Sequence, residues 1–195
     1  MNSKADLRRS LRAAIDRLGA AERAAASAQA RNLLRRQPVW TSAQAILFYA
    51  PIAGEIDLTL LLEEAVAAGK AVALPGFVAR TGTYDAFQIS HLGRDCVPGK
   101  LGISEPSPSC PAFPLNRLDL ALVPGLGFDL SGHRLGRGRG FYDRLLAGLA
   151  GTKCGVAFDP QIVARVPAET HDIRMNFILT PTRWLAVSGP GAEQP

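Results

Sequence analysis

The stretch DLALVPGLGFDLSGHRLGRGRGFYDRLL, residues 119–146, joins a hydrophobic run to an amphipathic segment through a loop rich in glycine and arginine. Its first six residues predict a buried strand, and the segment from about 140 to 150 predicts a helix with one apolar face. Between them, residues 132–140 contain three arginines and four glycines. The order strand, loop, helix predicts an α/β unit whose loop follows the carboxyl end of a strand, where ligands bind in open α/β sheets.

Further strand and helix patterns extend this unit in both directions. Ser3 and Asp6 form a capping box that predicts the start of a first helix, and an Ala-rich helix follows Gly19 and ends before Pro38. Asp57 and Gly69 bound another helix. Apolar or alternating runs predict strands at 45–50, 71–75, 83–90, 155–158, 177–180 and 184–187.

Apolar strands that alternate with helices predict an α/β fold of three layers, with a mainly parallel sheet and helices on both faces. At 195 residues the chain fits one domain, which we place at residues 1–188. The Pro/Gly/Ser-rich stretch 98–114 is predicted to be a long surface loop, and residues 189–195 a flexible tail.

Composition excludes several classes of protein. Hydrophobic residues make up 47% of the chain and charged residues 20%, as in a globular domain, and no apolar run approaches the length of a membrane span. Residues 1–36 carry nine basic and three acidic side chains, and those acids argue against a transit peptide. Three cysteines without C-x-x-C spacing argue against a disulfide framework or zinc site, so we expect a cytoplasmic protein.

The loop at 132–140 has two interpretations on composition alone. Arginine forks and glycine backbones suit an anion site, but disordered RNA-binding tails have the same composition. The loop lacks the Walker A pattern, and Gly136–Gly140 is one residue short of the dinucleotide fingerprint. A single copy between two core elements favours an anion site, to which the following helix N-terminus would contribute.

The sequence around this loop resembles the 5-formyltetrahydrofolate cyclo-ligase family, also called methenyltetrahydrofolate synthetases. The central resemblance covers VPGLGFD at 123–129 and GHRLGRGRGFYDR at 132–144. Four shorter motifs stand in order along the chain: Lys4-x-x-Leu7-Arg8, GEID at 54–57, LGISEP at 101–106, and His171-Asp172.

The resemblance implies a fold of the NagB/RpiA/CoA-transferase group and an ATP- and Mg²⁺-dependent enzyme, which we expect to be a monomer that acts on small molecules. It implies conversion of 5-formyltetrahydrofolate to 5,10-methenyltetrahydrofolate with release of ADP and phosphate. The formyl oxygen attacks the γ-phosphate, and N10 then closes the ring. Such chemistry asks for positioning and charge neutralisation and needs no protein nucleophile.

Site residues follow from the matched positions. Arg134 and Tyr142 are the expected catalytic residues, and Asp143 and Asp172 the expected magnesium ligands. The expected substrate-binding residues are Glu55, Arg137, Gly138, Arg139, Gly140 and Phe141. The expected ATP-binding residues are Lys4, Arg8, Arg134, Leu135, Gly136, Arg137, Gly138, Arg139, Gly140, Phe141 and Tyr142.

Each assignment has a structural alternative. Lys4 and Arg8 could form a solvated helix face, and Arg137 and Arg139 could simply face water. Asp143 could pair with Arg139 at i, i+4. Glu55 could be an exposed acid at the entry to a helix, and Asp172 could be a turn residue. His133 and His171 border the proposed site and could contact phosphate.

Two departures from the family pattern leave other functions open. Phe141 stands where tyrosine is common, and residues 76–90 lack the usual methionine-containing strand. A paralogue that binds folate or nucleotide without this activity is therefore one alternative. A basic nucleic-acid-binding protein is the other, because residues 1–36 have a net charge of +6; steep salt dependence of binding would identify it.

Overall fold

The computed structural model describes residues 3–99, 103–169 and 172–187. Across these residues, seven strands form the main sheet in the order β12-β11-β9-β6-β1-β2-β3. The five inner strands run parallel, and β12 and β3 are antiparallel edge strands. In chain order the seven are β1 (Ala45–Leu47), β2 (Ala71–Val78), β3 (Thr83–Ile89), β6 (Leu120–Pro124), β9 (Thr152–Val156), β11 (Phe177–Leu179) and β12 (Trp184–Ala186).

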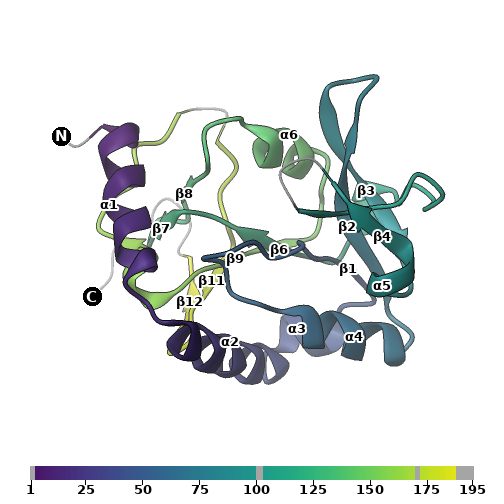
Figure 1. Ribbon diagram of the computed structural model, residues 1–195, viewed down its shortest axis with the longest axis horizontal. Helices are drawn as coiled ribbons and strands as arrows, with labels where there is room; N and C mark the ends of the chain where they lie inside the picture. Colours follow the sequence, from purple (N-terminus) through teal and green to yellow (C-terminus); the bar gives the residue numbers. More distant parts are fainter. Residues whose placement is uncertain (1–2, 100–102, 170–171, 188–195) are drawn as a thin grey trace.

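Helices cover both faces of this sheet, as predicted (Figure 1). One face carries α2 (Ala20–Arg35), α3 (Pro38–Ser42) and α4 (Thr59–Ala67), and the other carries α6 (Phe141–Ala147). Successive strand residues point to opposite faces. Ile46 thus packs with the α2–α4 side, whereas Leu47 packs with the α6 side.

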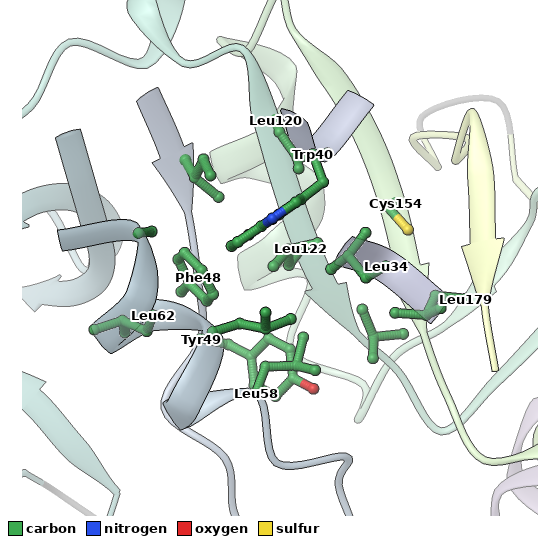
Figure 2. Close-up of a cluster of buried hydrophobic side chains, with 14 of the residues drawn as sticks. Leu34, Trp40, Phe48, Tyr49, Leu58, Leu62, Leu120, Leu122, Cys154 and Leu179 are labelled. Carbon is green, nitrogen blue, oxygen red and sulfur yellow. The ribbon is translucent and has the colours of Figure 1, made fainter. Parts of the chain in front are cut away.

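The α2–α4 face contains an extensive apolar core (Figure 2). Leu34 and Trp40 from the helices meet Leu120 and Leu122 of β6 and Phe48, which directly follows β1. Trp40 lies edge-to-face on Phe48 with ring centroids 6.1 Å apart. Burial of these large side chains contributes the main hydrophobic stabilisation of this layer. This core covers one face of the sheet, and the loop at 132–140 lies on the opposite side.

The first helix, α1 (Lys4–Asp16), packs away from the main sheet. Ser3 caps it as predicted, since its side chain accepts a hydrogen bond from the Asp6 amide at 3.1 Å. Leu11 packs on Leu126 and Leu135, at a small sheet that sequence patterns did not predict, formed by β7 (Gly127–Asp129), β8 (Arg134–Leu135) and β10 (Ile162–Val163). A Cβ on Gly127 would lie 2.6 Å from Leu11 Cδ1, so this glycine permits the close approach of α1.

Three expectations for secondary structure need correction. The stretch 98–114 is more than a loop, because β5 (Ser104–Pro106) pairs with β4 (Cys96–Pro98), which follows the short α5 (Leu92–Asp95). The strand expected at 155–158 is β9, which begins three residues earlier. Its polar Thr152 and Lys153 conceal its start from an apolar pattern. Pro38 not only ends α2 but also begins α3 in the first turn, where proline is tolerated.

Some expectations fall outside the described residues, namely the tail at 189–195 and the motif residues Leu101, Gly102 and His171. Among the helices of the described residues, none is long and apolar enough to cross a membrane.

Candidate functional site

A cavity of about 480 Å³ lies at the carboxyl ends of β1 and β6, between α1 and the sheet. Tyr49 and Ala50 follow β1 into it, and Pro124 enters from the end of β6. Every residue that the sequence assigned to the site lines this cavity: Lys4, Arg8, Glu55, Arg134, Leu135, Gly136, Arg137, Gly138, Arg139, Gly140, Phe141, Tyr142, Asp143 and Asp172. The fold thus gathers segments up to 168 residues apart, as the Lys4–Asp172 contact illustrates.

Cations from α1 form one side of the cavity. Arg8 Nε donates a hydrogen bond to the carbonyl oxygen of Gly136 at 2.9 Å, which ties the first helix to the Arg/Gly loop. Lys4 Nζ lies 2.8 Å from Glu169 Oε1 and 3.4 Å from Asp172 Oδ2. These two carboxylates, Glu169 first, raise the pKa of the Lys4 ammonium. Lys4 is therefore a charged group held over the cavity rather than a solvated surface lysine.

Arg134 is a buried arginine with one acidic partner. Its side chain is 5% exposed, and Nη2 lies 3.0 Å from Asp143 Oδ1. The guanidinium also lies over the Tyr142 ring, 5.4 Å from its centroid. Asp143 therefore pairs with Arg134, and the alternative pairing with Arg139 is wrong.

Two glycines make room for the Arg134 side chain. A Cβ on Gly136 would lie 2.9 Å from Arg134 Nη1, and one on Gly125 would lie 3.1 Å from its Cγ. Arg134 Nε is buried and has no hydrogen-bond partner in the part of the chain that the structure describes. A buried donor without a partner is costly, so this nitrogen is available to an incoming anion.

Glu55 and Arg137 form an ion pair across the cavity. Glu55 Oε1 lies 3.1 Å from Arg137 Nη2, and Oε2 accepts a hydrogen bond from the Ile52 amide at 3.2 Å. The Glu55 side chain is only 10% exposed, and burial raises its pKa despite both contacts. Glu55 is therefore a buried carboxylate that faces the site, and the alternative of an exposed acid at a helix entry is wrong.

An aromatic corner, which sequence reasoning did not find as a group, contributes Tyr84 and Phe141 to the cavity wall. We use this term for Phe77, Tyr84 and Phe141, whose ring centroids are 5.0–6.2 Å apart with interplanar angles of 64–67°. Burial raises the pKa of the Tyr84 phenol, and the negative charge of the nearby Glu105 carboxylate raises it further. Phe77 and Tyr84 are paired directly in the β2–β3 ladder.

Ile103, Ser104 and Glu105 line the cavity beside Tyr84, so part of the stretch 76–114 belongs to the site. Tyr84 carried no sequence signal beyond its place in an alternating strand. Glu105, by contrast, belongs to the LGISEP motif at 101–106, which the sequence analysis did identify.

The Tyr142 hydroxyl is a hydrogen-bond donor rather than a base. Burial raises the pKa of this phenol strongly, and the nearby Glu55 carboxylate acts in the same direction. Tyr142 lines the cavity between Phe141 and Asp143, at the start of α6. A phenol that stays protonated can donate a hydrogen bond to a developing negative charge.

Asp143 and Asp172 both line the cavity and could take part in a magnesium site. Magnesium is commonly held by one or two carboxylates together with substrate phosphates and water. The described residues contain no group of three or more His, Cys, Asp or Glu side chains suited to a metal ion. The donor set therefore fits a magnesium that arrives with phosphates better than a site built from protein ligands alone.

Other candidates have structural roles. His133 Nδ1 lies 3.1 Å from the carboxylate of the buried Asp129, and His133 is not among the cavity-lining residues, so the suggestion that it contacts phosphate lacks support. Asn176 Oδ1 accepts a hydrogen bond from the Lys153 amide at 2.8 Å.

Comparison with known proteins identifies the family. The model of the 5-formyltetrahydrofolate cyclo-ligase family matches residues 1–181. The 5-formyltetrahydrofolate cyclo-ligase of Mycolicibacterium smegmatis is 36% identical over 149 residues, which cover 73% of this chain and 76% of the relative. The enzyme of the same name from Escherichia coli K12 is 33% identical over 159 residues, which cover 80% of this chain and 87% of the relative.

Solved structures agree. The NMR structure of Aquifex aeolicus 5,10-methenyltetrahydrofolate synthetase superposes with a TM-score of 0.85 at 30% identity, covering 98% of this chain and 96% of that one. The synthetase structure from Mycoplasma pneumoniae, at 21% identity and a TM-score of 0.74, supports the fold. The chain is therefore an enzyme that belongs to the 5-formyltetrahydrofolate cyclo-ligase family.

Proposed function

We propose that this enzyme converts 5-formyltetrahydrofolate to 5,10-methenyltetrahydrofolate at the expense of ATP, as a cytoplasmic monomer. The observation that carries the proposal is that one cavity has two kinds of lining, one cationic and one acidic and aromatic. Lys4, Arg8 and Arg134 suit a polyphosphate, whereas the buried Glu55 and the aromatic corner suit a flat heterocycle with N–H donors. The relatives named cyclo-ligase or synthetase support the same substrates.

The reaction requires two successive bond-forming steps. The formyl oxygen attacks the γ-phosphorus of ATP, the bond to the β,γ-bridging oxygen breaks, and ADP leaves. The lone pair of N10 then attacks the activated formyl carbon and N10 loses its proton. Cleavage of the carbon–oxygen bond releases phosphate and leaves the methenyl cation.

The Arg/Gly loop would hold the reacting phosphate. Gly136, Gly138 and Gly140 bring backbone amides to the cavity, and Gly138 and Gly140 adopt φ values of +105° and +62° that only glycine takes readily. Arg134, with its free Nε, and the protonated Tyr142 would stabilise charge that develops during phosphoryl transfer.

Glu55 would orient the folate. Its carboxylate can accept hydrogen bonds from the donor nitrogens of the pterin ring, and Ile52 holds it in place from behind. The 10% exposure of Glu55 makes such contacts strong, because water competes poorly there.

Asp143 and Asp172 would hold Mg²⁺ together with the ATP phosphates. The ion, when bound, neutralises phosphate charge and so favours attack by a weak nucleophile. On the protein side, the Arg134–Asp143 ion pair keeps the Asp143 carboxylate oriented toward the cavity.

A spectrophotometric assay for the methenyl product tests the proposal directly. Folded enzyme with ATP, Mg²⁺ and 5-formyltetrahydrofolate should form product, and omission of ATP should abolish it. If no product forms above a no-enzyme control, the chain is a paralogue that binds these ligands without this activity.

The contacts of the basic amino-terminal residues argue against the nucleic-acid alternative. Lys4 pairs with Glu169, Arg35 pairs with Glu64, and Arg31 donates a hydrogen bond to the Asp57 carbonyl oxygen. Internal carboxylates therefore offset part of the positive charge that a phosphate backbone would need. Retention on nucleic acid at moderate salt would revive this alternative.

A further inference from the structure

A buried acid outside the cavity, Asp129, connects two parts of the proposed site. Its side chain is 3% exposed, and it is not among the cavity-lining residues. Oδ1 accepts hydrogen bonds from the Ser131 and His133 amides, both at 3.0 Å. Oδ2 accepts one from the Val166 amide at 2.8 Å and lies 3.1 Å from His133 Nδ1. The carboxylate thus joins the turn between β7 and β8 to a segment 37 residues away along the chain.

The turn alone does not explain a carboxylate at this position. One acceptor oxygen is enough to hold the amides that follow a turn residue, and asparagine supplies it without a charge. A buried charge is costly unless it is paired and hydrogen-bonded. Since the second oxygen of Asp129 accepts from the Val166 amide, the contact that requires a carboxylate is the one to the distant segment.

The segment that carries Asp172 is anchored on both sides to this same turn. Before Asp172, the Val166 amide is held by Asp129. After it, the Met175 amide donates a hydrogen bond to the carbonyl oxygen of Gly132 at 2.9 Å. Val166 and Met175 are themselves only 1% and 2% exposed. The turn therefore determines where Asp172 meets the cavity.

The turn also leads directly into Arg134. Arg134 is the first residue of β8, pairs with Phe128 in the β7–β8 ladder, and lies 3.0 Å from the Asp143 carboxylate. The turn thus sets the positions of both proposed magnesium ligands, Asp143 and Asp172. The described residues contain no larger group of metal-ligating side chains, so a magnesium site depends on the alignment of these two acids.

We infer that Asp129 is a positioning residue for the proposed magnesium site, which aligns Asp172 with Asp143 through the Val166 amide. The inference rests on the magnesium role proposed above for Asp172. Asp129 touches neither substrate nor metal and acts only through the segments that it joins. Outer contacts of this kind typically contribute about 10- to 100-fold to metal affinity.

Binding of the non-hydrolysable β,γ-imido analogue of ATP, with and without Mg²⁺, tests the inference without turnover. Calorimetry should show that Mg²⁺ tightens binding to the wild type. Asp129→Asn keeps one oxygen for the turn but turns an N–H group toward the Val166 amide. It should reduce the Mg²⁺-dependent gain by about tenfold and leave binding without Mg²⁺ unchanged. An undiminished gain overturns the inference alone, whereas a wild type without any gain overturns the proposed magnesium role and the inference with it.

His133→Ala is the matched control. It removes the ring contact but leaves the Asp129 carboxylate and its hydrogen bonds to three backbone amides. This variant should keep the Mg²⁺-dependent gain, and an equal loss in both variants would indicate general loosening of the turn and overturn the inference.

A double-mutant cycle separates positioning from a general structural role. In an Asp172→Asn background, Asp129→Asn should have little further effect on the Mg²⁺-dependent gain, because both changes act through one carboxylate. Losses that add overturn the inference.

Hydrogen exchange in the wild type provides a test that needs no variant, should Asp129→Asn not fold. Because coupling between two sites is reciprocal, a Val166 hydrogen bond that favours Mg²⁺ binding must itself be stabilised by Mg²⁺. Exchange of the Val166 amide should slow by about tenfold when Mg²⁺ is added to the enzyme with bound analogue. The Ser131 amide, held by the other oxygen, is the reference and should slow much less. An unchanged Val166 exchange rate overturns the inference.

Discussion

The two sides of the cavity are built in different ways. The proposed nucleotide side consists of Lys4, Arg8 and Arg134, which come from one helix and from the segment 132–140, and its cations are held by carboxylates or carbonyl groups. The proposed substrate side consists of Glu55, Tyr84 and Glu105, which come from three separate segments and are acidic or aromatic.

The difference shows how the charges of this site are compensated before any ligand binds. Arg137 from the loop pairs with Glu55 across the cavity, whereas Arg134 pairs with Asp143 within its own side. Arginines in the loop therefore act on protein stability as well as on ligands. In a freely solvated anion-binding loop, by contrast, the arginines would act on ligands alone.

Arg134→Ala should have the largest effect. Removal of the 5% exposed guanidinium leaves the Asp143 carboxylate without its partner, which should cost about 3 kcal/mol of unfolding free energy. Loss of transition-state stabilisation should also lower kcat/KM for ATP by about 100-fold or more. Chemical denaturation and steady-state kinetics measure the two effects separately.

Arg139→Ala is the control from the same loop. Its side chain is exposed, so the unfolding free energy should stay within about 0.5 kcal/mol of the wild type. If Arg134→Ala proves equally stable, Arg134 is a phosphate ligand without a structural role, and the contrast between the two sides fails.

Glu55→Gln should come next. A neutral amide accepts weaker hydrogen bonds than a carboxylate, so KM for folate should rise by about 10- to 100-fold while KM for ATP changes little. A double-mutant cycle with Arg137→Gln measures the coupling across the cavity, and the effects of the two changes should not add. Strict additivity would mean that the ion pair seen at 3.1 Å contributes nothing in solution.

The nucleotide side was predictable from the sequence because its signal is continuous. Gly132–Asp143 places the glycines, Arg134 and Asp143 within twelve positions, between two recognisable core elements. The motif also reflects local backbone requirements, such as the positive φ of Gly138, which favours glycine at that position.

The substrate side was only partly predictable, because tertiary packing creates it. Glu55 was found through a short motif, but Tyr84 carries no local signal and meets Phe141 only through the fold, with ring centroids 5.0 Å apart. The edge strand β3 and the short β5 bring Tyr84 and Glu105 together, and the sequence pattern described that second segment as a loop.

Asp172→Asn should have a moderate effect, confined to magnesium. Asp172 lines the cavity, where its carboxylate lies 3.4 Å from Lys4 Nζ, and its replacement should raise the Mg²⁺ concentration for half-maximal activity by about tenfold. Glu169→Gln, on the same turn and also in contact with Lys4, should shift the Mg²⁺ titration much less. Equal shifts in both variants would indicate that Lys4, rather than the metal, responds to these acids.

The smallest effect should be a pH-dependent change in stability at Glu55. Burial raises the folded-state pKa of this carboxyl above its unfolded value near 4.5, so folding opposes its ionisation. Below that value both states are protonated and Glu55→Gln should match the wild type. As the pH rises through the folded-state pKa, the wild type must ionise a buried acid, and the variant should gain relative stability of about 1 kcal/mol or less. Denaturation curves at pH 4 to 8 measure this difference, and a constant difference would show that Arg137 fully offsets the burial of Glu55.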